Sequence, residues 1–146
     1  MNPFLLPPAE RLADWKQFRQ SLHALDEPAQ WQAVAQYWAQ PPLLPTVPPM
    51  WVLDDTPSIW DMIYDNKWCR NSVVLGMEAT LRLAGVAADR MTLRLIHDSY
   101  CEVLVLVIDD RWMLNYDWGC LIPYSNTHEI IRQWRFSGRN YSTFDG

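Results

Sequence analysis

Three absences in the sequence exclude large classes of function. The 146 residues contain no cluster of lysine and arginine, and the formal net charge is −5. Because nucleic acids bind basic surfaces, we expect no nucleic-acid partner. Only five glycines occur, and they form no phosphate-binding loop. No apolar run is long enough to span a membrane, and the start of the chain, which lacks a basic region, is not expected to be a signal peptide or an anchor.

Cysteine is also sparse. The three cysteines, Cys69, Cys101 and Cys120, are odd in number, and their spacing matches no metal-binding motif. We therefore expect reduced thiols, a cytoplasmic location, and neither a metal ion nor a cofactor. Paired aspartates occur at Asp54–Asp55 and Asp109–Asp110, but aspartate is common in turns for backbone reasons.

Apolar residues make up 49% of the chain, which includes nine tryptophans and eleven prolines. This composition is typical of a globular protein, and the length suits one domain over residues 1–146. We divide it into a helical N-terminal part (1–40), a proline-rich arm (41–57), a core (58–136) and an extended tail (137–146). The apolar content of the arm favours packing on the domain, and contact with a partner is the alternative.

Two helices are predicted in the N-terminal part. The first extends from Pro8 to about Leu25, and the second has Asp26 as N-cap and continues to about Gln40. The side chains expected to face the core are Leu12, Trp15, Phe18, Leu22, Trp31, Val34, Tyr37 and Trp38.

The sequence also predicts a third helix, with a cysteine at its start. The turn Asp65–Ser72 is expected to place Cys69 in the first turn of a helix that ends near Ala84, with Gly76 on the same buried face for close approach to a sheet. A thiol at a helix N-terminus is more easily ionised, which is one way to build a nucleophile. The alternative is that Cys69 is a small buried apolar residue, as most free cysteines are.

The following segments predict an antiparallel meander. Its strands are Met91–His97, Glu102–Ile108 and Arg111–Tyr116, with a two-residue turn at Asp109–Asp110. A further short strand or helix is expected at Glu129–Phe136. The predicted fold class is α+β, with the N-terminal helices and the cysteine-bearing helix packed on a small antiparallel sheet.

Several short segments, in this order, resemble the bacterial transglutaminase-like cysteine proteinases of the papain-like and transglutaminase-like group. Pro57–Ile63 lies where that family has a helix with proline and carboxylates, and Trp68–Asn71 lies where it has Asp-Cys-Glu-Asp. Leu83–Met91 is similar to its Leu-Gly-Val-Pro-Ala-Glu-Arg-Leu passage, and Arg111–Asn115 to its Trp-x-Leu-Asp segment. The resemblance covers roughly Thr56–Trp118.

The resemblance implies a catalytic thiol at Cys69, a histidine base and a carboxylate that orients the imidazole. The position of the family's histidine is taken here by Cys101 or Glu102, and that of its aspartate by Asn115. If the segment 98–101 forms a hairpin turn, His97 and Glu102 face each other across the ladder. His97 is then a candidate base oriented by Glu102 or Asn115, and the alternative is a half-exposed histidine at a strand end.

Two functions follow from these patterns. In the first, the chain is a pseudoenzyme: a non-catalytic structural or interaction subunit that contacts other protein subunits through the proline-rich arm and exposed aromatic residues. A component of a larger assembly, such as a phage virion or tail, is one such role. In the second, the chain is a small thiol peptidase or amidase with Cys69 as nucleophile and His97 as base.

Overall fold

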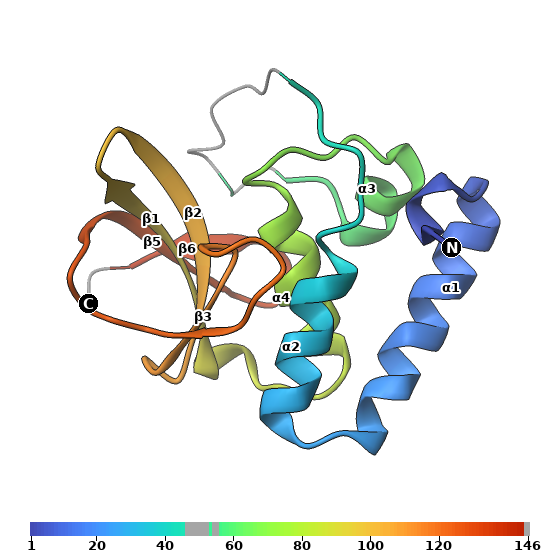
Figure 1. The fold of residues 1–146 in the computed structure, drawn as a ribbon, viewed down its shortest axis with the longest axis horizontal. Helices are drawn as coiled ribbons and strands as arrows, with labels where there is room; N and C mark the ends of the chain where they lie inside the picture. Colours follow the sequence, from blue (N-terminus) through green and yellow to red (C-terminus); the bar gives the residue numbers. More distant parts are fainter. Residues whose placement is uncertain (46–52, 54–55, 145–146) are drawn as a thin grey trace.

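The computed structural model describes residues 1–45, 53 and 56–144, which form four α-helices and a six-stranded antiparallel sheet (Figure 1). The helices are α1 (Pro8–Ser21), α2 (Glu27–Tyr37), α3 (Ile59–Asp65) and α4 (Val73–Leu83). The strands are β1 (Met91–Asp98), β2 (Cys101–Ile108), β3 (Trp112–Leu114), β4 (Ile122–Pro123), β5 (Glu129–Phe136) and β6 (Tyr141–Thr143). None of the described helices has the length and apolarity needed to cross a membrane.

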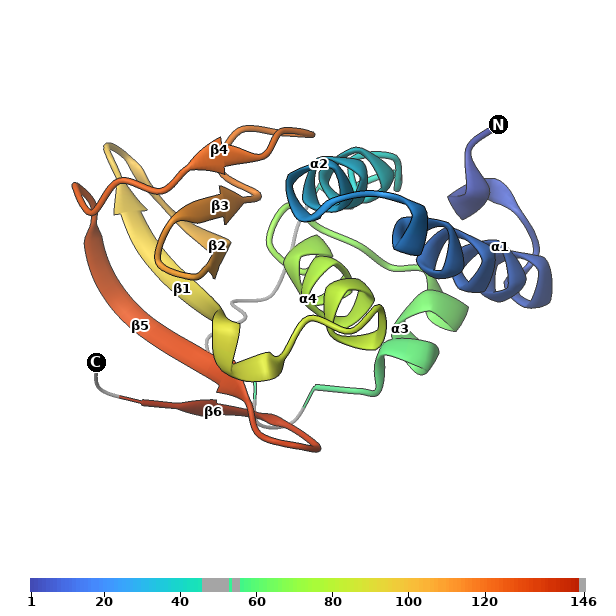
Figure 2. The same cartoon turned by 90° about the horizontal axis from the view of Figure 1, so that it is seen from below.

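The helices lie on one side of the sheet, and α4 lies between the sheet and helices α1 and α3 (Figure 2). The strand order is β4-β3-β2-β1-β5-β6. One apolar cluster fills the space between helices and sheet, and a smaller one covers the opposite face. The buried residues of the second cluster are Ile96, Val105, Val107 and Met113. Strand β2 is therefore covered on both faces, as its nearly continuous apolar run predicts.

The sheet is larger than the predicted meander. Glu129–Phe136 is a strand that returns to pair with β1, and the tail, expected to be extended, contributes β6 as a sixth strand. The predicted two-residue turn after β2 is also wrong, because Ile108 pairs with Trp112 and leaves three residues between them. Asp109 and Asp110 both have positive φ, which aspartate tolerates better than most residues.

The N-terminal helices begin where the sequence predicts. Asp26 is the N-cap of α2, and its carboxylate accepts a hydrogen bond from the backbone N–H of Ala29. Helix α1 ends at Ser21, earlier than expected, because the chain continues as a 3₁₀ turn over Leu22–Ala24. The predicted core residues of both helices are buried or partly buried.

One hydroxyl group joins three helices in the core. Thr80 Oγ1 accepts hydrogen bonds from Nε1 of Trp15 (3.0 Å) and of Trp38 (2.9 Å), and it donates to the carbonyl of Gly76 (2.6 Å). A Cβ atom added at Gly76 would overlap the indole ring of Trp38. Gly76 therefore permits the close approach of α2, and not of the sheet as the sequence suggested.

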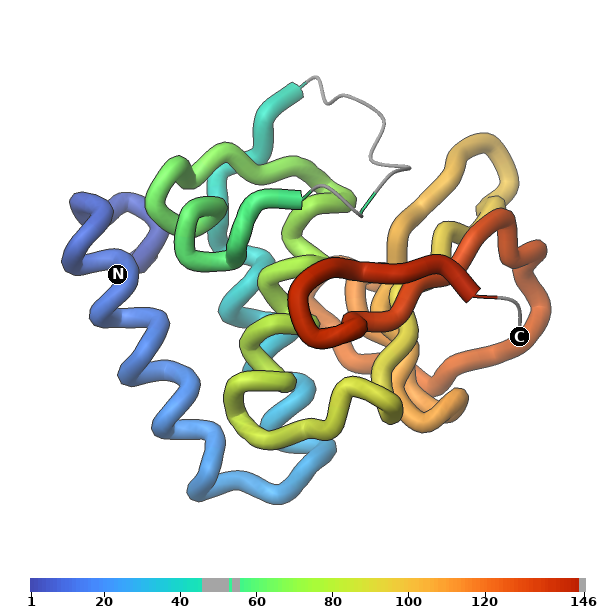
Figure 3. Tube along the Cα trace, turned by 180° about the vertical axis from the view of Figure 1, so that it is seen from behind, coloured from blue at the N-terminus to red at the C-terminus, as the bar shows by residue number. Residues whose placement is uncertain are grey.

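The C-terminal hairpin lies beside α4 (Figure 3), and a buried carboxylate on α4 bonds to it. Glu78 is 2% exposed. Its Oε1 accepts a hydrogen bond from the Tyr141 hydroxyl (2.8 Å), and its Oε2 lies 3.1 Å from Nε of Arg82. Burial raises the pKa of Glu78, and the hydrogen bonds from Arg82 and Tyr141 oppose that effect.

Replacing Gly76 by alanine should destabilise the protein. The added methyl group displaces the Trp38 indole, which costs about 1–3 kcal/mol, and the gain in helix propensity returns only about 1 kcal/mol. Chemical unfolding measures the net loss. In a Trp38→Leu background, which removes the ring, the same substitution should be nearly neutral, and equal losses in both backgrounds would refute the assigned contact.

The pH dependence of stability should reveal the buried carboxyl group. Because the pKa of Glu78 is raised, its contribution to stability is complete below its ordinary value of 4.5 and is lost as the pH rises through the raised pKa. The unfolding free energy of the wild type, relative to Glu78→Gln, should therefore fall as the pH rises above 4.5 in urea titrations. A relative increase would contradict the raised pKa. Replacement of the exposed Glu10 by glutamine serves as control.

Candidate functional site

The turn before α4 carries the predicted nucleophile. Cys69 precedes α4 and does not lie in its first turn, which corrects the expected helix start. The N–H groups of Val74 and Leu75 bond to carbonyls three residues earlier, at Asn71 and Ser72, so the chain enters the helix through a tighter 3₁₀-type turn. The helical hydrogen bond from the N–H of Val73 to the carbonyl of Cys69 (3.3 Å) nevertheless starts at the cysteine.

The thiol of Cys69 takes part in a reciprocal pair of hydrogen bonds. Its Sγ accepts from the N–H of Ser72 (3.2 Å), and the Ser72 hydroxyl accepts from the N–H of Cys69 (2.9 Å). This is the arrangement of a capping box, with the sulfur in place of the usual capping oxygen. Cys69 is 2% exposed. Its side chain therefore satisfies backbone donors at the entry to α4 from a position that solvent hardly reaches.

Asn115 attaches this turn to the sheet. Its Nδ2 donates to the carbonyls of Arg70 and Leu104, both at 2.9 Å, and it is almost fully buried. Asn71 completes the link, because its Oδ1 accepts from the N–H of Leu104 (3.1 Å). Both amide hydrogens of Asn115 are thus used on backbone oxygens, and its backbone φ of 73° is one that asparagine adopts readily.

The proposed base lies at the end of β1. His97 pairs with Glu102 across the β1–β2 ladder, as the predicted hairpin requires, and with Glu129 of β5 on its other side. All three side chains are exposed. No hydrogen bond within the described part of the chain joins His97 to Cys69, Glu102 or Asn115. The structure thus pairs His97 with Glu102 in the sheet and leaves Cys69 bonded to Ser72.

A second polar cluster was not foreseen. The Tyr116 hydroxyl donates to Oδ1 of Asp98 (3.0 Å) and lies 3.2 Å from Nε2 of His128, which is 3.8 Å from the same carboxylate oxygen. The hydrogen bond to Asp98 raises the pKa of Tyr116. Tyr116 packs on the apolar cluster of the outer sheet face. His128 lies just before β5, and nothing in its sequence neighbourhood signals a contact with Asp98 of β1.

Side chains that could bind a metal ion are not clustered in the described part of the chain. Among residues 1–45, 53 and 56–144, no group of three or more His, Cys, Asp or Glu side chains is arranged to hold a metal ion.

The described ends of the proline-rich arm contact the rest of the molecule. Leu43 forms an isolated parallel bridge with Trp68, and the N–H of Leu44 donates to the Trp68 carbonyl (2.9 Å). Leu53 is fully buried. The arm therefore begins beside the turn that carries Cys69. Its residues 46–52 and 54–55 lie outside the described part, so the expected packing of those residues stays a prediction.

Changing Asn115 to aspartate tests whether this residue orients a catalytic group or supports the turn. A carboxylate cannot donate to the carbonyls of Arg70 and Leu104, and it would be buried against them. We expect a loss of about 3 kcal/mol or more of unfolding free energy, measured by urea denaturation. The exposed Asn140→Asp is the matched control. Unchanged stability in Asn115→Asp would contradict the supporting role.

The comparisons with known proteins concern the fold. Neither a protein-family model nor a curated protein matches the sequence. Among solved structures, calcium-bound LapG of Legionella pneumophila aligns with 86% of this chain and 73% of its own, with a TM-score of 0.64 and 16% sequence identity. LapG is a bacterial cysteine protease of the transglutaminase-like fold. The predicted fold class is therefore confirmed: the chain has an α+β, transglutaminase-like fold.

Proposed function

We propose that the chain is a non-catalytic interaction module built on a transglutaminase-like fold. The observation that carries the proposal is the role of Cys69, whose buried sulfur accepts a hydrogen bond from Ser72 and caps the entry to α4. A cysteine nucleophile has to reach its substrate and transfer its proton to a base. Here the sulfur has a structural partner, and no histidine is hydrogen-bonded to it within the described residues.

The other two positions of a triad support the same proposal. Along β2, Cys101 and Glu102 stand where the resemblance places the base, and both are exposed. Neither is an imidazole. Asn115 stands where the orienting aspartate is expected, but its amide hydrogens bind the carbonyls of Arg70 and Leu104. The atom that could orient an imidazole by accepting its N–H is Oδ1, and no described histidine is hydrogen-bonded to that atom.

The alternative hydrolase would require a rearrangement at the start of α4. Catalytic hydrogen bonds are often long in structures without substrate, so a separation between Cys69 and His97 is not decisive by itself. Exposing the sulfur, however, breaks its bond to Ser72 and uncaps the turn. This cost weighs against catalysis and in favour of an interaction role.

Large apolar side chains on the surface supply candidate contacts for protein partners. Trp60 and Tyr64 lie one turn apart on α3 and are 47% and 59% exposed, and Tyr100 at the β1–β2 turn is 99% exposed. Leu43 and Leu44 of the arm are also exposed. Exposed aromatic residues are enriched in protein interfaces. We therefore infer that the partners are other protein subunits, within a larger assembly.

Alkylation of Cys69 tests the proposal. In a variant with Cys101→Ser and Cys120→Ser, only Cys69 remains to react with iodoacetamide. We expect slow modification, limited by opening of the fold, and the same rate after a further His97→Ala substitution, because the buried sulfur is not paired with this histidine. Mass spectrometry over time measures the rate.

The matched control retains the exposed Cys101 and carries Cys69→Ala and Cys120→Ser, and it should react rapidly. Fast alkylation of Cys69 that slows in His97→Ala would establish a working Cys–His pair and overturn the non-catalytic proposal.

A further inference from the structure

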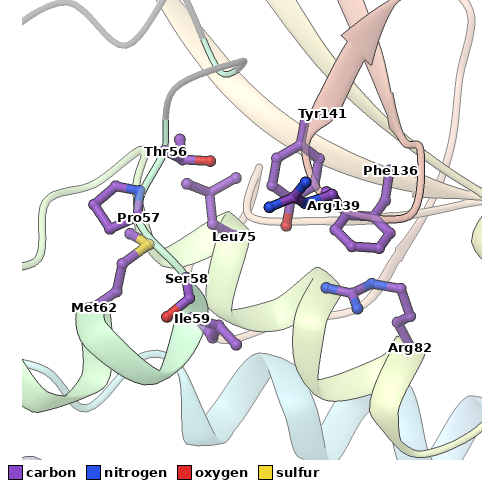
Figure 4. A pocket seen from close by; sticks show the side chains of 10 residues that line it. All are labelled: Thr56, Pro57, Ser58, Ile59, Met62, Leu75, Arg82, Phe136, Arg139 and Tyr141. Atoms are coloured by element: carbon purple, nitrogen blue, oxygen red, sulfur yellow. The ribbon is translucent and has the colours of Figure 1, made fainter.

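A small pocket lies between α3, α4 and the C-terminal hairpin (Figure 4). Two guanidinium groups line it, from Arg82 on α4 and from Arg139 in the β5–β6 turn. Ile59 and Met62 of α3 lie across the pocket, and Phe136 stands beside Arg82. The pocket thus combines cationic groups with apolar walls.

The hydrogen-bond donors of the two arginines are only partly used. Arg82 directs Nε and Nη2 at the Glu78 carboxylate, and its guanidinium lies 3.5 Å from the centroid of the Phe136 ring. Its Nη1 makes no hydrogen bond to Glu78. Arg139 is exposed and, within the described residues, makes no hydrogen bond or ion pair. Donors from both side chains remain available to a ligand.

The charges around the pocket favour a single negative charge. Among the described residues, Glu78 offsets the charge of Arg82, so Arg139 leaves an excess of one positive charge when Glu78 is ionised. The Tyr141 hydroxyl donates to Glu78 and can only accept from a ligand. Asp61 does not line the pocket, and its carboxylate accepts a hydrogen bond from Ser58. A monoanionic carboxylate matches this excess better than a dianionic phosphate.

The size of the pocket points to the same ligand. Its volume is about 40 Å³. A water molecule requires about 10–15 Å³ by this measure, so the pocket admits about three water-sized groups. That space accommodates a carboxylate but not a whole amino acid. Arginine binds carboxylates through paired N–H donors, and the walls formed by Ile59 and Met62 can contact the methylene groups that carry the carboxylate.

We propose that this pocket binds the carboxylate of an aspartate or glutamate side chain in an acidic segment of a partner protein. Arg139 and Nη1 of Arg82 donate to the carboxylate, and the apolar wall covers its side chain. The proposal rests on the interaction function and names the chemistry of the partner. It is distinct from the turn that carries Cys69, because no residue of the turn Asp65–Ser72 lines the pocket.

The test uses the full chain and the blocked peptide acetyl-Ala-Glu-Ala-amide, with acetyl-Ala-Gln-Ala-amide and inorganic phosphate for comparison. NMR signals of the arginine Nε–Hε groups report binding. We expect the glutamate peptide to shift the signals of Arg82 and Arg139 saturably, and the glutamine peptide to bind at least about tenfold more weakly.

Arg139→Gln should reduce the affinity for the glutamate peptide about tenfold or more, because a charge-assisted hydrogen bond is lost. Since Arg139 is exposed in a turn, this variant should fold, and unchanged spectra elsewhere verify it. Arg111→Gln, at another exposed turn, should bind as the wild type does.

Three results would overturn the proposal: no saturable shift, unchanged affinity in Arg139→Gln, or tighter binding of phosphate than of the glutamate peptide. Each of them would leave the alkylation behaviour of Cys69 as it is. Conversely, a reactive Cys69 would refute the non-catalytic function without changing the peptide titration, so the two failures are distinguishable.

Discussion

The hydroxyl group of Thr80 is the interaction on which the helical layer depends. A threonine hydroxyl has one donor and two acceptor sites, and here all three are used, by Gly76, Trp15 and Trp38. Because α1, α2 and α4 each supply one partner or more, the orientation of three helices is linked to a single atom in the core. A buried polar network of this kind specifies its partners when every member is satisfied.

Hydrogen bonds before and along α4 link this core to the sheet and to the C-terminal hairpin. At the beginning of the helix, Cys69 and Ser72 satisfy each other's backbone donors, and Asn115 holds the preceding turn to β2. At its middle, Glu78 accepts a hydrogen bond from Tyr141 of the C-terminal hairpin. Polar side chains at positions that resemble a proteinase site therefore serve the fold. In this structure the Cys69 sulfur accepts a backbone hydrogen bond ahead of α4 and so supports the turn.

Local patterns predicted the parts of this structure that depend on near neighbours. Asp26 marks the start of α2 through its own side chain, and His97 meets Glu102 because only a short turn separates their strands. Other features depend on distant partners and leave no local signal. Arg11 is buried on α1, where its guanidinium donates to the carbonyl of Ile63 at the end of α3, 52 residues away. The hydrogen bonds that the side-chain amide of Asn115 donates were unpredictable for the same reason.

The position of β1 has a consequence for the order in which the chain can fold. Its neighbour β2 is joined to it by a tight turn, whereas β5 reaches it only after β2, β3 and β4 have intervened. Closing this larger loop costs entropy before the new strand contacts return any free energy. The β1–β2 hairpin is therefore suited to form early, and β5 with β6 to join late. Assembly then ends when Tyr141 reaches Glu78, so the last residues to dock complete the enclosure of the only carboxylate on α4.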